Sequence, residues 1–131
     1  MKILIIDDDQ NIRKLVSFNL SLKKHQVFAA KDGQEGIQLA ISQQPDLILL
    51  DIMMPVMNGY ETCKKLKADE RTKNIPVFML SARGQMTDLD DAFNSGADDY
   101  IVKPFDVGKL NYTIDYKMNT YLERLSRKKT D

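Results

Sequence analysis

Four apolar residues stand between two aspartates in the segment Asp46-Leu-Ile-Leu-Leu-Asp51-Ile-Met-Met-Pro55. Such a run is typical of a strand that is buried on both faces of a parallel sheet. The run ends at Asp51, and Pro55 and Gly59 turn the chain soon afterwards. A carboxylate in that position lies at the edge where open α/β sheets bind ligands. Asp is also common in turns and helix caps, so Asp51 alone does not establish a site.

Four further segments have strand patterns, and these are residues 2–7, 27–30, 75–80 and 99–102. Helices are predicted between them, over residues 10–23, up to Pro45, over residues 59–68 and 86–95, and from about residue 106 onwards. Strand and helix alternate five times, with connections too long for hairpins, which implies right-handed crossovers between parallel strands. The sequence therefore predicts an α/β fold, a doubly wound parallel sheet with helices on both faces.

The bulk composition is that of one globular domain, since 131 residues can bury a core of their own. The 19 basic and 19 acidic side chains leave no net charge to attract nucleic acid or a membrane surface. The single cysteine, Cys63, cannot form an internal disulfide, which favours a reducing compartment. No apolar run reaches membrane-spanning length, and the residues Met1-Lys2-Ile3 are expected to lead into a strand rather than a signal peptide. We therefore expect a cytoplasmic domain that binds neither nucleic acid directly nor a membrane.

Polar side chains follow most of the predicted strands, and these are Asp7, Asp8 and Asp9, then Asp51, Ser81 and Lys103. Each alone has an ordinary explanation, such as Asp8 as a helix N-cap, Ser81 as a loop hydroxyl or Lys103 as a surface charge. The C-termini of parallel strands share one edge, however, and carboxylates gathered there repel one another unless a cation joins them. Carboxylates with water suit Mg²⁺, which takes few protein ligands.

This set of groups is suited to phosphoryl transfer. With a metal ion screening the acids, Asp51 could attack phosphorus in line and form an acyl phosphate. Lys103 would pair with one phosphoryl oxygen as a point charge, and Ser81 would donate a hydrogen bond to another. Backbone N–H groups of residues 52–53 would supply further donors.

Four motifs in this order resemble the receiver domains of two-component response regulators, including the chemotaxis receivers. They are Ile-Ile-Asp7-Asp8-Asp9, Leu-Leu-Asp51-Ile-Met-Met-Pro55-Val-Met-Asn-Gly59, Met-Leu-Ser81-Ala82 and Gly96-Ala-Asp-Asp-Tyr100-Ile-Val-Lys103-Pro104-Phe105. The resemblance covers residues 2–118 and implies a flavodoxin-like (βα)5 fold with strand order 2-1-3-4-5. It divides the chain into a receiver domain, residues 1–118, and an extension of the last helix, residues 119–131.

The resemblance also implies a role for each matching residue. Asp51 would be the phospho-acceptor, served by a sensor histidine kinase or a phosphotransfer protein. Mg²⁺ (or Mn²⁺) would be held by Asp8, Asp51 and the backbone carbonyl of Met53, with Asp7 acting through water. Such a domain catalyses only its own phosphorylation and dephosphorylation, and is otherwise not an enzyme.

The switching machinery would lie beside this site. Lys103 would bind the phosphate, Ser81 would be the switch hydroxyl and Tyr100 the switch aromatic, and the Lys103–Pro104 peptide bond would be cis. Phosphorylation would then change the surface formed by residues 86–95, the fifth strand and the last helix. Met53 and Arg83 stand where this family modulates its rates. An apolar Met53 cannot position water, so we expect a phosphate lifetime of minutes or longer.

Two other functions fit parts of the sequence. A haloacid-dehalogenase-type phosphatase would use Asp7 as its nucleophile, with Asp9, Ser81 and Mg²⁺, but leaves Asp51 and the Lys103-Pro104-Phe105 motif unexplained. A degenerate receiver that only binds partners is less consistent with the complete acid, hydroxyl and lysine set.

The C-terminal segment predicts one long helix, because apolar residues recur at Leu110, Ile114, Met118, Tyr121 and Leu125. A helix of about 20 residues would be about 30 Å long, and its last turns would extend past the domain. Either this end is a frayed basic tail, or it mediates homodimerisation or leads into an output domain. Leu89, Asn94 and Thr113 stand where winged-helix DNA-binding regulators typically carry charged dimer residues, which argues against that dimer.

Overall fold

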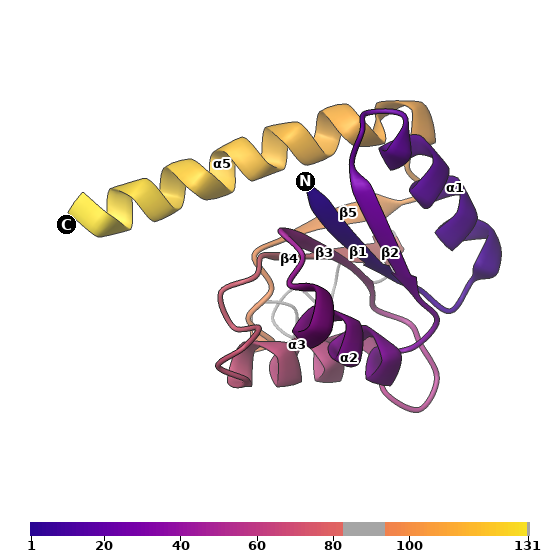
Figure 1. Cartoon of the computed structure of the whole chain (residues 1–131), viewed down its shortest axis with the longest axis horizontal. Coiled ribbons are helices and arrows are strands. Elements are labelled where there is room, and N and C mark those ends of the chain that lie inside the picture. Colours follow the sequence, from indigo (N-terminus) through magenta and orange to yellow (C-terminus); the bar gives the residue numbers. More distant parts are fainter. Residues whose placement is uncertain (83–93, 131) are drawn as a thin grey trace.

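The computed structural model describes residues 1–82 and 94–130 (Figure 1). Its elements are β1 (Lys2–Ile6), α1 (Gln10–Ser21), β2 (Gln26–Ala30), α2 (Gly33–Gln43), β3 (Leu47–Asp51), α3 (Gly59–Ala68), β4 (Val77–Ala82), β5 (Asp99–Lys103), the 3-10 turn η2 (Val107–Lys109) and α5 (Leu110–Thr130). Arg83 and most of the helix predicted over residues 86–95 lie outside the described residues.

The five strands form one parallel sheet in the order β2-β1-β3-β4-β5, which confirms the predicted α/β class and strand order. β3 lies at the centre, and all five of its residues are buried. Its continuous apolar run is therefore explained by helices on both faces of the sheet.

Side chains that alternate along each strand build two separate cores. Leu4, Ile48 and Leu50 pack on the face covered by α2 and α3, together with Leu66 of α3. Ile3, Leu47 and Leu49 pack on the opposite face, covered by α1 and α5. Figure 1 shows the two helix layers on either side of the sheet. The acid-bearing strand ends are thereby fixed by a buried framework.

Several element boundaries differ from the sequence-based prediction. β4 begins at Val77, because Pro76 has no N–H to contribute to a sheet ladder. Asp106 caps the short η2 turn by accepting a hydrogen bond from the N–H of Gly108, so α5 begins only at Leu110.

The long last helix is present as predicted, with 21 residues, and Figure 1 shows it continuing past the sheet. Leu110, Ile114 and Met118 are buried, whereas Leu125 is exposed. No helix within the described ranges is both long and apolar enough to span a membrane.

Candidate functional site

Three aspartates meet at the carboxyl edge of the sheet, because β1 and β3 are hydrogen-bonded neighbours that end side by side. Asp7 and Asp8 follow β1 and Asp51 ends β3, and one carboxylate oxygen of each lies within 4.8 Å of the others. Asp7 is fully buried, Asp51 is 6% exposed and Asp8 is exposed. Three clustered carboxylates with one open to solvent are a donor set that fits a hard divalent cation such as Mg²⁺.

Lys103, the last residue of β5, supplies a positive charge to this cluster. Its Nζ donates hydrogen bonds to Oδ2 of Asp7 at 3.0 Å and to Oδ1 of Asp51 at 3.1 Å. One lysine therefore joins the carboxylates that end two different strands. The peptide bond that follows it, Lys103–Pro104, is cis.

Backbone groups hold Asp7 in place. Its Oδ1 accepts a hydrogen bond from the N–H of Asp9 at 2.9 Å, so both of its carboxylate oxygens are engaged. Its carbonyl oxygen accepts from Nη1 of Arg13 at 2.6 Å. Asp9, not Asp8, caps α1, since its side chain accepts from the N–H of Asn11 at 2.8 Å. The N-cap explanation for Asp8 is therefore wrong, and the Asp8 carboxylate is left to the cluster.

The cluster changes the acidity of its members. Burial, and next the negative charge of Asp7, raise the pKa of Asp51 from 3.8 to about 6, although Lys103 opposes the shift. Burial acts to lower the pKa of Lys103, but its hydrogen bond to Asp7 and the charge of Asp51 outweigh this and raise it. An ionised Asp51 is therefore costly until a further cation joins the site.

The segment after Asp51 is packed tightly against the start of α3. The N–H of Gly59 donates to the carbonyl of Ile52 at 2.8 Å. A Cβ on Gly59 would meet the carbonyl oxygen of Asp51 and would lie 2.7 Å from Cα of Ile52. Only glycine lets the two segments approach this closely. On the solvent side, the Met53 side chain is 65% exposed.

A family model described as the response regulator receiver domain matches residues 3–115. The chain belongs to this family. The receiver is 52% identical over 109 residues to the DNA-binding dual master transcriptional regulator RpaA of Synechocystis sp., a match that covers 83% of this chain and 45% of RpaA. It is 38% identical over 109 residues to the response regulator ArlR of Staphylococcus aureus, covering 83% of this chain and 48% of ArlR. The chain thus spans about half the length of the curated relatives it matches.

Solved structures of other receivers share the fold. The chemotaxis response regulator CheY4 of Vibrio cholerae superposes with a TM-score of 0.82 at 32% identity, covering 88% of this chain and 97% of CheY4. The receiver domain of NtrX from Brucella abortus gives a TM-score of 0.80 at 29% identity, covering 90% and 98%. The chain is therefore a signalling domain of a two-component response regulator, and the phosphatase alternative built on Asp7 is not favoured.

The two residues expected to act as switches lie on β4 and β5, which follow β3 on one side of the receiver's cluster. Ser81 is buried near the end of β4, one residue beyond Leu80, which pairs with Asp51, and its hydroxyl donates to the carbonyl of Ala82 at 3.1 Å. Tyr100 is half-buried on β5 and packs against the core on the α2 and α3 face. Within the described residues, no hydrogen bond joins either side chain to the three aspartates. Arg83, the other residue expected to influence rates, lies outside them.

A cavity of about 690 Å³ opens beside the receiver's acidic cluster. Asp8 forms part of its wall, together with Arg13, Lys31, Val56 and Met57. Sequence reasoning missed Arg13 and Lys31, because neither belongs to a motif and only the fold brings them to the site. The cavity gives a second molecule access to the exposed side of the cluster.

Proposed function

We propose that this receiver accepts a phosphoryl group on Asp51 from the phosphohistidine of a sensor histidine kinase or a phosphotransfer protein. The observation that carries the proposal is the contact of Lys103 with Oδ1 of Asp51 at 3.1 Å, inside a cluster of three carboxylates. Asp7 has both carboxylate oxygens engaged by hydrogen bonds. Within the described residues, no hydrogen bond engages Oδ2 of Asp51, which leaves that oxygen available as a nucleophile.

The transfer step forms one bond and breaks one. A carboxylate oxygen of Asp51 bonds to phosphorus while the phosphorus–nitrogen bond to the donor imidazole breaks. The imidazole nitrogen keeps the electron pair and takes up a proton, and Asp51 becomes an acyl phosphate. Lys103 pairs with one phosphoryl oxygen, and the Ser81 hydroxyl turns from the Ala82 carbonyl to donate to another.

Asp8, Asp51 and the backbone carbonyl of Met53 would hold Mg²⁺ (or Mn²⁺), with Asp7 acting through water. The fit rests on the donor set, since three carboxylates lie within 4.8 Å of one another and only Asp8 is exposed. When bound, the ion offsets the negative charge that otherwise repels the incoming phosphoryl group.

Phosphorylation would act as a charge switch. It adds a charge of about −1.5 to −2 at Asp51, and Ser81 moves toward the new oxygens while Tyr100 turns inward. The surface formed by residues 86–95, β5 and α5 changes as a result. Shifting a 1:99 mixture to 99:1 requires the phosphate to favour the active state by about 5.5 kcal/mol. Met53, which cannot position an attacking water, and Arg83 would give the phosphate a lifetime of minutes or longer.

The chain would work in the cytoplasm as one part of a signalling pair. Residues 1–118 form the receiver domain, and residues 119–131 extend the last helix as a linker or a dimerisation segment. Its output would pass to a downstream protein or to an output domain such as the one implied by the name of RpaA, without direct contact between this domain and nucleic acid. A homodimer would form through the switching surface or through α5.

The decisive experiment is phosphorylation by acetyl phosphate with Mg²⁺, read by intact mass and peptide mapping. The wild-type chain gains one phosphoryl group on Asp51, and Asp51→Asn gains none. Asp115→Asn, which removes an exposed carboxylate on α5, serves as the matched control and is labelled normally. Label on Asp7, or undiminished labelling of Asp51→Asn, would contradict the proposal.

A further inference from the structure

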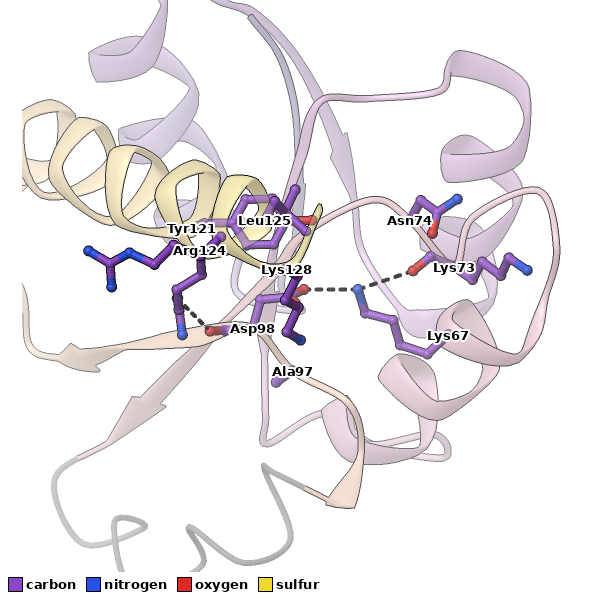
Figure 2. A pocket seen from close by; sticks show the side chains of 10 residues that line it. Lys67, Lys73, Asn74, Ala97, Asp98, Tyr121, Arg124, Leu125 and Lys128 are labelled. Atoms are coloured by element: carbon purple, nitrogen blue, oxygen red, sulfur yellow. Dashed lines mark hydrogen bonds and ion pairs between the residues drawn. The ribbon is translucent and has the colours of Figure 1, made fainter. Parts of the chain in front are cut away.

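A second cavity, of about 410 Å³, lies at the opposite edge of the sheet from the acidic cluster. Lys73 and Asn74, which precede β4, form one side of it, and Ala97 and Asp98, which precede β5, lie beside them. The last turns of α5 border it on the side that faces Lys73 and Asn74, as Figure 2 shows. Its size is in the range of small-molecule sites. Its lining residues lie where β4 and β5 begin, whereas Asp51 lies where β3 ends, at the other end of the parallel strands.

The cavity is strongly cationic although the whole chain has no net charge. Its lining contains one acid, Asp98, and five cations, which are Lys67, Lys73, Arg124, Arg127 and Lys128. Three of these cations come from two turns of a single helix. A concentration of positive charge in a concave site attracts anions.

Two of these cations, Lys67 and Lys73, already form salt bridges within the protein. Asp98 accepts from Nζ of Lys67 at 2.8 Å and from the N–H of Val77 at 2.9 Å. Lys67 also donates to the carbonyl of Ile75 at 2.8 Å, so the Lys67–Asp98 pair, which Figure 2 shows, is held in place at one side of the cavity. Lys73 pairs with Glu70 at 2.7 Å.

Two of the α5 cations, Arg124 and Lys128, are not used in this way. Within residues 1–82 and 94–128, no carboxylate forms a salt bridge with Arg124 or Lys128. Arg124 makes one long hydrogen bond, 3.4 Å from Nη2 to the carbonyl of Asp98. Both side chains are exposed on the cavity side of the helix, where they are placed to bind an incoming anion.

One wall of the cavity is apolar. The stripe of α5 that is buried at Leu110, Ile114 and Met118 continues through half-buried Tyr121 to Leu125, which is 38% exposed. Leu125 is not part of the buried core, and both Tyr121 and Leu125 line the cavity. An aromatic ring and a leucine beside a cationic rim suit a ligand with a flat apolar body and a phosphate group.

We propose that this cavity binds a nucleoside phosphate, with the base against Tyr121 and Leu125 and the phosphates on Arg124 and Lys128. A bound ligand would join the end of α5 to the segment before β4. The site would therefore control the position of the last helical turns independently of events at Asp51.

The test is a set of separate titrations of the ¹⁵N-labelled chain with ATP, pyrophosphate, adenosine and a short DNA duplex. They are made in EDTA, so that metal-bound phosphate cannot occupy the acidic cluster. ATP should saturate and shift the amides of Asn74, Asp98 and Leu125, about tenfold more tightly than pyrophosphate or adenosine. Non-saturating shifts, equal affinity for ATP and pyrophosphate, or binding of duplex DNA but not ATP would each overturn the proposal.

Variants locate the site. Arg124→Gln with Lys128→Gln should weaken ATP by about tenfold or more, while Lys14→Gln with Lys23→Gln on the α1 side leaves it within about twofold. Leu125→Ala should weaken ATP and leave pyrophosphate unchanged. These side chains are exposed, and circular dichroism checks that each variant folds. Equal losses in the two charge-removing pairs would show non-specific attraction and reject the site.

Discussion

Nζ of Lys103 lies 3.1 Å from Oδ1 of Asp51, although the two residues are 52 positions apart and β4 runs between their strands. The same ammonium reaches Asp7 at 3.0 Å. The carboxyl edge of the sheet is therefore held together by a long side chain that crosses a neighbouring strand.

Removing the ammonium should destabilise the chain strongly. Lys103→Met leaves the fully buried Asp7 without its charge partner, and breaking a buried pair costs about 3 kcal/mol. Urea unfolding at pH 7.5 in EDTA measures the loss, and added Mg²⁺ should restore part of it. Lys117→Met is the matched control, because Lys117 pairs with the more exposed Asp99 and should cost less than about 1 kcal/mol. Equal losses of unfolding free energy in the two variants would show that the Lys103 contacts stabilise the chain no more than an ordinary surface ion pair does.

Asp51 should make the metal-free protein less stable as the pH rises. Its pKa is raised to about 6 in the folded chain from 3.8, so the native state holds the proton more tightly than the unfolded state. The penalty is absent below about pH 4, grows between the two values and is complete above about pH 6. In EDTA, Asp51→Asn should therefore be more stable than wild type at pH 7.5 by on the order of 2 kcal/mol, and by much less at pH 4.5. Glu123→Gln, an exposed control, should show no such dependence.

Mg²⁺ should stabilise the folded chain at neutral pH. An ion that binds only the native state at ten times its dissociation constant adds about 1.4 kcal/mol, which is a few degrees in Tm for a domain of this size. Thermal unfolding with and without MgCl₂ measures the shift. Asp8→Asn should remove most of it, whereas Asp46→Asn, whose carboxylate bonds the N–H of Lys2, should keep it. A full shift in Asp8→Asn would exclude Asp8 as a ligand.

Gly59→Ala should damage both stability and phosphorylation. The new Cβ would meet backbone atoms of Asp51 and Ile52, so the start of α3 must move, at a cost of about 2 kcal/mol or more. The displacement is transmitted to Asp51, and labelling by acetyl phosphate should slow. Gly108→Ala is the control, since its Cβ would come no nearer than 3.2 Å to the side-chain Oδ1 of Asp106. Normal labelling of Gly59→Ala would show that Asp51 tolerates the shift.

Local patterns in the sequence were sufficient to predict most of the fold. The apolar run of β3 predicted a central buried strand, and the alternation of strands and helices predicted parallel order, because few chain paths satisfy both. Because parallel strands end at one edge of a sheet, the sequence also predicted that Asp7, Asp8 and Asp51 lie close together. Boundaries were less accurate where one backbone group decides them, as at Pro76 before β4.

The rest depended on contacts that no local pattern encodes. Motifs pointed to Lys103 as a phosphate partner, but not to its contact with Asp7, which is 96 positions away. Asp9 rather than Asp8 caps α1, because the backbone is extended at Asp9 and its side chain accepts from the N–H groups of Asn11 and Ile12. Three consecutive aspartates in the sequence do not show which of them takes that position. Likewise the cationic cavity under α5 exists only because the helix folds back over the starts of β4 and β5.

The length of α5 has a mechanical consequence. Its 21 residues give a rod of about 31 Å that begins shortly after Lys103, and its first half is anchored in the core by Leu110, Ile114 and Met118. A tilt of about 5° at Met118 would carry the far end, which lies about 18 Å further along the helix, through roughly 1.6 Å. The helix is thus a lever arm, and anything attached to its tip would experience an amplified copy of small movements at the base.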